Sequence, residues 1–539
     1  MTASTSRPSR RLALPVNPPV RAIAAFLAGA AAATGFEPIS LWPLTLISIG
    51  VLAHLVNTAG KTRGAALYGW LFGVGHFWVG NTWIATAFTY QAQMPAWLGW
   101  IAVFLLSLYL AVYPMLAAFG ARLVAGRRPL GITVIALAGC WIVAEWLRAW
   151  VFTGFAWNPL GAVTLGGFNR PGLALLAPWL GTYALSGLVV VLGGAWLWAY
   201  RAIRGSAPKW QAAFALLLPA ALMLVPIPPP AQGAGTLPFR LVQPDVRQDV
   251  LNDPAHFEAN FIKTALLTGG PVSKADKTIM LWPESGVPDY LREGYPDRYY
   301  LATTYAADPA AARQRIADMV GPGGMLLTGS VDLVLDPQTR RAAAAENVVT
   351  AVGPDGEIAA GYAKAHLVPY GEYLPMRAIL EPLGLSRLVA GTLDFRAGPG
   401  PQTLDLGDWG KAGIQICYEI VFSGEVVDGS NRPDYLFNPS NDGWFGSWGP
   451  PQHLAQARLR AIEEGLPILR ATTTGISAVI DAGGVVRQHA PMHAAAQLSG
   501  MVPPALSPTP FSRLGNLLPL GWAALLIVAA MVASRRARR

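Results

Sequence analysis

The chain has 539 residues, of which 53% are hydrophobic and only 13% are charged, whereas soluble domains carry about 25% charged residues. This composition excludes an ordinary soluble enzyme, and the aromatic content of 10% excludes a disordered chain. The net charge of +9 does not indicate nucleic-acid binding, because the excess of Lys and Arg lies in the apolar segments 1–227 and 514–539. The segment 228–513 between them is net acidic.

Seven apolar runs in the first 227 residues, and one near the C-terminus, are long enough to cross a bilayer, which takes about 20 residues. The predicted spans are about 21–36, 41–58, 64–85, 95–120, 130–151, 172–199, 210–227 and 515–534. A cleaved signal peptide is the alternative for the first run, because Arg7, Arg10 and Arg11 precede it. Since six further spans follow without a break, we interpret the first run as a span as well.

Lys and Arg predict the orientation of these spans, because basic loops are retained in the cytoplasm. Basic residues precede the first predicted span, lie between spans two and three, four and five, and six and seven, and follow the last. The opposite loops near 37–40 and 86–94 contain none, and the loop 152–171 contains only Arg170. The pattern predicts a multi-pass membrane protein with both termini in the cytoplasm and residues 228–514 on the other side of the membrane.

The chain is predicted to divide into three regions. Residues 1–233 form a membrane domain of about seven helices, residues 234–510 form a domain outside the cytoplasm, and residues 511–539 form a last transmembrane helix with a basic cytoplasmic tail. In the middle region short β-rich runs alternate with helical patterns, which indicates a layered α/β or α+β domain. Several runs are continuously apolar, as expected for a sheet that is covered on both faces.

Only Glu145 and Arg148 are ionised within the predicted spans. A transporter more often carries paired charges and broken helices in mid-membrane, so this plan favours an enzyme held on the bilayer. The two side chains lie one helical turn apart and are able to form a structural ion pair. Alternatively, Arg148 faces a lipid headgroup phosphate, which makes it a candidate substrate contact.

The two cysteines have different expected roles. Cys140 lies within a span and is expected to pack against another helix. Cys417, in GIQICYEIVF, lies in the extracytoplasmic segment without a partner for a disulfide, although the compartment outside the cytoplasmic membrane is oxidising. It is either a buried structural cysteine or a nucleophile. A nucleophilic thiol needs a base or a cation beside it.

Three segments place ionisable groups at the ends of buried strands, where layered folds build their sites. Glu284 follows an apolar run in TIMLWPESGVP, Lys364 and Glu372 bracket a turn in GYAKAHLVPYGEYLP, and Cys417 ends the run in GIQICYEIVF. Each is a weak signal alone. Together they predict a thiol nucleophile with a carboxylate base and a cation.

These segments, followed by NPSNDGWFG, resemble the nitrilase or carbon–nitrogen hydrolase superfamily, whose Glu-Lys-Cys triad matches Glu284, Lys364 and Cys417. HLVPYGEYLP, SNDGWFG and the membrane-side segment 145–161 are similar to its membrane branch, the apolipoprotein N-acyltransferases. The resemblance implies a protein of the bacterial cytoplasmic (inner) membrane, in which residues 234–510 form a periplasmic catalytic domain with an α-β-β-α sandwich fold. One departure is that relatives carry a Trp shortly after the first strand of this domain, where this chain reads RQDVLNDPAHF, so a contact of that Trp with substrate is not expected here.

The resemblance implies transfer of a fatty acyl chain from a phospholipid, with phosphatidylethanolamine as the expected donor. The acceptor would be the α-amino group of a diacylglyceryl-cysteine at the N-terminus of an apolipoprotein. A ping-pong reaction would pass through a thioester on Cys417, with Glu284 as the base and Lys364 and the backbone N–H of Tyr418 at the oxyanion. Glu372 would orient Lys364 or Glu284.

Three further residues are candidate substrate contacts. Glu419 flanks the nucleophile and is expected to line the pocket with Tyr418. Trp444 and Phe445 either pack in the core or form a loop that grips an acyl chain, since aromatic residues favour the membrane interface. His366 is expected to be structural, because the triad already supplies a base.

No cofactor or metal is expected, because the sequence has no His/Cys cluster with ligand spacing and no glycine-rich phosphate loop between a strand and a helix. The main alternative function is a membrane-anchored amidase of the nitrilase type that hydrolyses a small amide. A non-catalytic transporter or scaffold is a further alternative, but it predicts an incomplete triad. Seven spans favour the acyltransferase, because a hydrolase of soluble substrates needs one anchor.

Overall fold

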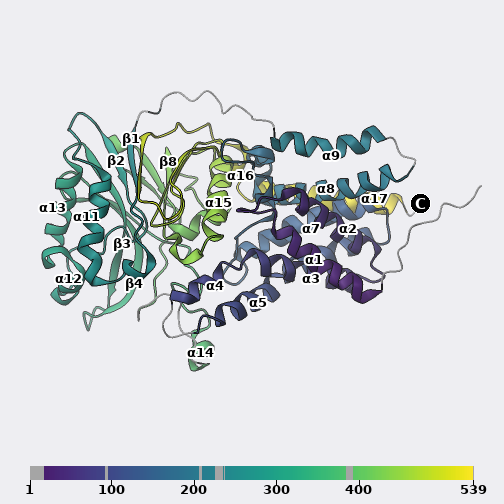
Figure 1. Ribbon diagram of the computed structural model, residues 1–539, viewed down its shortest axis with the longest axis horizontal. Coiled ribbons are helices and arrows are strands. Elements are labelled where there is room, and N and C mark those ends of the chain that lie inside the picture. The colour runs from purple at the N-terminus through teal and green to yellow at the C-terminus, as the bar shows by residue number, and fades with distance from the viewer. Residues whose placement is uncertain are drawn as a thin grey trace, which may run out of the picture.

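The computed structural model describes residues 17–90, 95–205, 209–224, 235, 237–383 and 393–537. Apolar helices gather at one end of the molecule and strands at the other (Figure 1). Several sequence predictions lie outside the described residues: the signal-peptide arginines Arg7, Arg10 and Arg11, the boundary at 233/234, the end of the span 210–227 and the last two arginines.

The helical end comprises nine N-terminal helices and the last helix of the chain. They are α1 (Pro18–Ala33), α2 (Trp42–Thr58), α3 (Thr62–Gly80), α4 (Ile84–Ala87), α5 (Leu98–Leu110), α6 (Val112–Ala125), α7 (Leu130–Trp150), α8 (Ala177–Ile203), α9 (Lys209–Leu224) and α17 (Leu517–Arg536). Helices α1 and α3 approach closely because Gly29 faces the backbone of Phe72 and Gly75 faces that of Phe26. Small residues allow such contacts between helices in a membrane.

Four helical segments among the described residues are long and apolar enough to cross a membrane: Leu98–Ala125, Leu130–Trp150, Gly172–Ile203 and Leu517–Arg536. They coincide with four of the eight predicted spans. The other four predicted spans correspond to helices α1, α2, α3 and α9, of which α1, α2 and α9 are apolar but shorter. The total number of spans and their orientation stay predictions.

The other end of the molecule is built on two six-stranded sheets. The first has the order β12 (Ala496–Met501), β1 (Pro238–Gln243), β2 (Thr278–Leu281), β3 (Gly324–Leu335), β4 (Ala342–Val352) and β5 (Ile358–Ala363). The second has the order β11 (Val486–His489), β10 (Ala478–Ile480), β9 (Ile468–Thr472), β8 (Tyr435–Ser440), β7 (Lys411–Ile414) and β6 (Thr403–Asp405). In each sheet three adjacent strands are mutually parallel, β1 to β3 in the first and β7 to β9 in the second, and all the other pairings are antiparallel.

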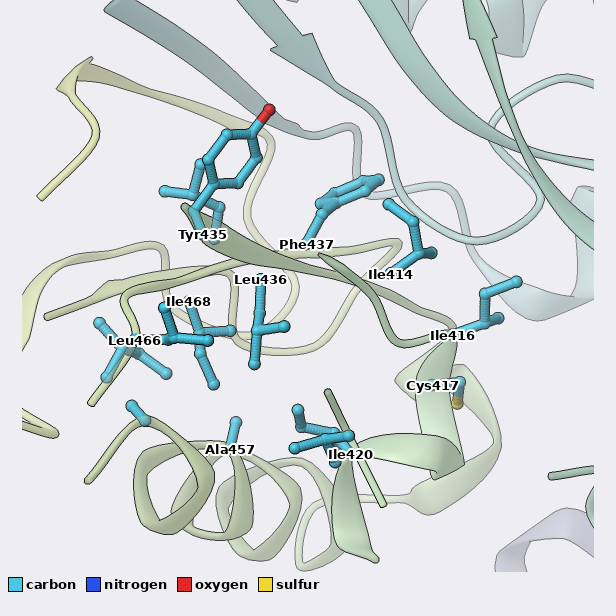
Figure 2. Close-up of a cluster of buried hydrophobic side chains, with 14 of the residues drawn as sticks. Ile414, Ile416, Cys417, Ile420, Tyr435, Leu436, Phe437, Ala457, Leu466 and Ile468 are labelled. Carbon is cyan, nitrogen blue, oxygen red and sulfur yellow. The ribbon is translucent and has the colours of Figure 1, made fainter. Parts of the chain in front are cut away.

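The alternation of side chains along the strands produces four layers. In the first sheet Leu281 packs in the core that the two sheets share, whereas Met280 packs with helices α11 (Phe257–Thr268) and α13 (Pro309–Val320) on the outer face. In the second sheet Tyr435 and Phe437 project from one side of β8 and Leu436 from the other, toward the helix that carries Ala457 (Figure 2). That helix is α15 (Gly449–Glu464). The predicted α-β-β-α sandwich is confirmed.

Four short helices lie between the longer elements of the described chain from residue 238 onward. They are α10 (Gln248–Leu251), α12 (Asp297–Thr303), α14 (Arg377–Leu380) and α16 (Pro510–Leu514).

Helix α15 also joins the sandwich to the membrane helices, and its charged residues are buried. The indole N–H of Trp157 donates to Gln452 Oε1 at 2.8 Å. Arg458 donates to the carbonyl oxygens of Gly166, Gly167 and Arg170, which precede α8. The outer layer of the sandwich is therefore docked on the membrane half through hydrogen bonds to backbone groups.

Candidate active site

Cys417 lies where strand β7 has ended and a short helical turn, Cys417–Val421, begins. Figure 2 shows it directly after Ile416, at the edge of the hydrophobic core. Its backbone φ of +50° is in the left-handed region, which non-glycine residues rarely adopt and which often marks functional sites. The chain therefore turns sharply at the candidate nucleophile.

Glu419 holds this turn in place. One carboxylate oxygen accepts from the backbone N–H of Ile416 at 2.7 Å, and the other accepts from the Tyr362 hydroxyl and the Ala365 N–H, both at 2.7 Å. Burial raises the pKa of Glu419, although these hydrogen bonds oppose the shift. Because its oxygens bond the loops that carry Cys417 and Lys364, this geometry favours a positioning role for Glu419 over the substrate contact that the sequence suggests.

Lys364 lies between two carboxylates. Its Nζ is 2.9 Å from Glu372 Oε1 and 3.6 Å from Glu284 Oε1, and all three side chains are buried. Burial alone would lower the pKa of Lys364, but the charges of Glu372 and Glu284 outweigh it and raise the pKa above its ordinary value. The ammonium therefore stays charged at neutral pH.

Two asparagines complete the hydrogen bonding of this cluster. The side-chain amide of Asn347, on β4, donates to Glu284 Oε1 at 2.7 Å and to Glu372 Oε1 at 3.0 Å. The backbone N–H of Asn441 donates to Glu284 Oε2 at 2.8 Å and also interacts with the Cys417 sulfur. The sequence analysis missed both residues, although a single amide within the apolar run NVVTAV is a signal for Asn347.

The Cys417 thiol shares this buried space. Burial and the charge of Glu284 raise its pKa well above the ordinary value, and the opposing charge of Lys364 does not offset them. The thiol is therefore protonated at neutral pH and requires a base to become a nucleophile. The Glu284 carboxylate is the base that the geometry offers.

The remaining candidates lie around this centre. Tyr418 is buried, and its hydroxyl faces the carbonyl oxygen of Gly154 in the membrane half at 3.5 Å. Phe445 packs edge-on against Trp83, with ring centroids 4.8 Å apart, and Trp444 packs against Tyr90 at 5.7 Å. The loop that carries both aromatic residues therefore contacts the membrane helices.

Arg148 does not face the lipid. It is 2% exposed, its Nη1 donates to the carbonyl oxygen of Trp157 at 2.8 Å, and its guanidinium lies over the ring of Phe77. Glu145, which the sequence suggests as the ion-pair partner of Arg148, accepts hydrogen bonds from the Trp141 indole and the Leu160 N–H. The expected contact with a headgroup is wrong, because the segment after α7 folds back over the end of the helix.

A hollow of about 500 Å³ lies beside the aromatic loop, between the membrane helices and the start of α15. Four of its lining residues are tryptophans, Trp83, Trp97, Trp100 and Trp448. Trp83 also touches Trp157, with centroids 4.6 Å apart, as well as Phe445. One wall of the hollow is thus continuous with the aromatic cluster behind the Cys417 loop.

Two family models match the chain. Residues 28–195 match the apolipoprotein N-acyltransferase N-terminal domain, and residues 241–494 match the carbon–nitrogen hydrolase family. Relatives described as apolipoprotein N-acyltransferases are similar over nearly the whole length. That of Rhodopseudomonas palustris is 35% identical over 92% of both chains, and that of Bradyrhizobium diazoefficiens is 35% identical over 96% of this chain and 95% of its own.

Solved structures that are similar to part of the chain include members of the nitrilase superfamily. A Saccharomyces cerevisiae protein of branch 10 of the nitrilase superfamily is 19% identical, with a TM-score of 0.34, over 51% of this chain and 92% of its own.

Proposed function

The chain belongs to the apolipoprotein N-acyltransferase family, and we propose that it transfers a fatty acyl chain from a membrane phospholipid to the N-terminal diacylglyceryl-cysteine of apolipoproteins. The acyl group is first carried as a thioester on Cys417, and phosphatidylethanolamine is the proposed donor. The observation that carries this proposal is the buried cluster of Glu284, Lys364 and Glu372 beside a protonated thiol. An amide-forming transfer requires such a base, cation and nucleophile.

The first half-reaction forms the thioester. Glu284 takes the proton of the Cys417 thiol while the sulfur attacks the ester carbonyl of the phospholipid. Lys364 and the backbone N–H of Tyr418 stabilise the oxyanion that forms. The tetrahedral adduct then expels the lysophospholipid oxygen, which takes the proton from Glu284.

The second half-reaction forms the amide. Glu284 removes a proton from the ammonium group of the acceptor cysteine, and the free amine attacks the thioester carbonyl. When this adduct collapses, the C–S bond breaks and the amide nitrogen loses its remaining extra proton to the departing thiolate. Glu284 releases the other proton to solvent, so the enzyme returns to its starting state.

The cation needs no rearrangement during either step. Lys364 is held by Glu372, and Asn347 holds both carboxylates. A preorganised charge stabilises a developing oxyanion without a cost of reorganisation. Glu372 and Asn347 are therefore proposed as positioning residues, and Glu284, Lys364 and Cys417 as the catalytic ones.

The membrane half supports a lipid substrate. Drawing an acyl chain into water costs about 0.8 kcal/mol per CH₂ group, so a site next to apolar helices avoids that cost. We assign the tryptophan-lined hollow to an acyl chain, because four tryptophan side chains line it and one of them, Trp83, also packs against Trp157 and Phe445. We also propose the division at 1–233, 234–510 and 511–539, with both termini in the cytoplasm, which the distribution of Lys and Arg supports.

Intact-protein mass spectrometry tests this function. Purified protein is incubated with phosphatidylethanolamine, with Cys417→Ala as the control. The expected result is a gain of one acyl chain on the wild type alone, which a diacylglyceryl-cysteine peptide discharges and water does not. An adduct that water removes at the same rate with or without peptide would identify an amidase-like hydrolase instead.

A further inference from the structure

A buried histidine contacts the backbone carbonyl of the candidate nucleophile. His453, on α15, is fully buried, and its Nε2 is 3.0 Å from the carbonyl oxygen of Cys417. Its Nδ1 is 2.9 Å from Arg470 Nη2 and 3.0 Å from Asp442 Oδ1. The proposed mechanism does not use any of these three side chains.

The surroundings fix which ring nitrogen carries the proton. A carbonyl oxygen only accepts, so Nε2 is the donor to Cys417. Both oxygens of Asp442 already accept from Arg470 Nη2, at 2.9 and 2.7 Å. Burial and the charge of Arg470 lower the pKa of His453, although Asp442 opposes the shift. His453 therefore donates through Nε2 to the Cys417 carbonyl, and its Nδ1 faces Arg470 Nη2 and Asp442 Oδ1.

The carbonyl that His453 binds belongs to the same peptide group as the N–H of Tyr418. A trans peptide is planar, and its C=O and N–H point in opposite directions. Holding the Cys417 oxygen on the His453 side therefore aims the Tyr418 N–H away from it. A hydrogen bond to the carbonyl also polarises the peptide and strengthens its N–H as a donor.

We propose that His453 is a positioning residue that builds the oxyanion hole, by binding the Cys417 carbonyl and so fixing the Tyr418 N–H against the reacting carbonyl oxygen of the acyl substrate. This inference rests on the proposed acyl transfer. The left-handed backbone at Cys417 needs such a restraint, because few non-glycine residues hold it unaided.

His453 is held by contacts with both halves of the molecule. Arg470, on β9, also donates to Ser440 of β8 at 3.0 Å, so the histidine is tied to the second sheet. The imidazole packs against the ring of Trp157 in the membrane half, with centroids 5.2 Å apart. The oxyanion hole is thus assembled on the contact between the sandwich and the membrane helices.

The test compares two reactions of the same sulfur in a Cys140→Ala background. Single-turnover thioester formation from phosphatidylethanolamine develops an oxyanion, whereas alkylation by iodoacetamide at pH 9 does not. His453→Phe, which keeps a planar ring but has no donor, is expected to slow thioester formation by about 10²- to 10³-fold, as the loss of an oxyanion donor does. Its alkylation rate is expected to stay within about threefold of wild type.

Two further variants sharpen the result. His453→Gln retains an N–H donor and is expected to recover at least about tenfold of the lost rate, and His453→Met is a second donorless side chain should the Phe variant not fold. His256→Phe is the matched control, because that histidine contacts only Asp253 at the surface. It should acylate at the wild-type rate.

The proposal would be overturned if a folded variant without a donor formed the thioester at the wild-type rate. It would also be overturned if acylation and alkylation slowed to the same extent, because that result indicates a collapsed loop. Absence of the adduct in the wild type would instead contradict the acyltransferase mechanism itself.

Discussion

Lys364 Nζ lies 2.9 Å from the Glu372 carboxylate, closer than the 3.6 Å that separates it from Glu284. The lysine thus has its main ion pair with a residue that is not the proposed base. This arrangement lets Lys364 remain a fixed cation while Glu284 is free to exchange protons with the thiol and the amine. Two buried carboxylates around one ammonium therefore have separate roles.

The first prediction follows from this division. Glu372→Gln removes the carboxylate that is nearer to Lys364. The ammonium is then expected to pair with Glu284 and to make this proposed base weaker. We expect thioester formation to slow by about 10- to 100-fold, within the usual contribution of general base catalysis. The measurement is the single-turnover rate by intact-protein mass spectrometry.

The matched control is Glu346→Gln, which removes a surface partner of Arg396 and should leave the rate unchanged. An unchanged rate in a folded Glu372→Gln protein would contradict the role given to Glu372.

The second prediction concerns the protonation of the nucleophile. Because the pKa of Cys417 is raised well above its ordinary value, the thiolate fraction should still be rising with pH at 9. In a Cys140→Ala background, where Cys417 is the only cysteine, we expect the iodoacetamide rate to increase through pH 9 without a plateau. Lys364→Met removes the charge that favours the thiolate and should shift this rise to higher pH.

A plateau in the alkylation rate near pH 7 would show that Cys417 is already a thiolate at neutral pH. The thiol would then need no base, which contradicts the role of Glu284 in the first step.

The residues of the candidate site differ in how well the sequence predicts them. Glu284, Lys364 and Cys417 are predictable because each stands at the end of an apolar run, and strand ends meet at one edge of a layered fold. Asn347 lies within β4, opposite Val331 of β3, and only the pairing of the strands brings its amide to the two carboxylates. The sequence therefore predicts the reacting groups better than the groups that orient them.

The contact between the two halves is the part that sequence patterns miss. In HLAQARLRAIEEG the charged residues are typical of a helix face in water, yet Arg458 is buried and binds carbonyl oxygens of the membrane half. Arg148 is expected at the lipid surface, yet Trp157 covers it. In both cases a distant part of the chain covers a side chain that the local pattern places in water or lipid. A local sequence pattern contains no information about which distant segment packs on it.

The third prediction is a pH dependence of stability at the end of α15. Burial, followed by the charge of Glu463, raises the pKa of Glu464 from 4.5 to about 7. The unfolded chain therefore releases this proton at lower pH than the folded protein, so the free energy of unfolding falls as pH rises from 4.5 to 7 and is then level. Glu464→Gln removes this effect.

The expected gain in stability for Glu464→Gln is up to about 3 kcal/mol at pH 8 and close to zero at pH 4.5, since one pKa unit corresponds to about 1.4 kcal/mol. Melting temperatures in detergent at the two pH values measure it, with the exposed Asp408→Asn as control. An equal gain at both pH values would show that the carboxyl is not titrating between them.

The fourth prediction tests the tryptophan-lined hollow as an acyl-chain site. Trp97 and Trp100 line it and are 60% and 56% exposed, so both rings have apolar surface available to a lipid. Trp97→Ala should raise the KM for phosphatidylethanolamine by about 5- to 20-fold and leave kcat nearly unchanged, because contacts far from the reacting carbonyl bind substrate and transition state alike.

Trp210→Ala is the matched control, since Trp210 is a comparably exposed tryptophan on α9, outside the hollow. Steady-state rates at varied mole fractions of the lipid in micelles separate the two constants. A fall in kcat at constant KM would place Trp97 in the chemical step, and equal kinetics for both variants would remove the hollow from the path of the acyl chain.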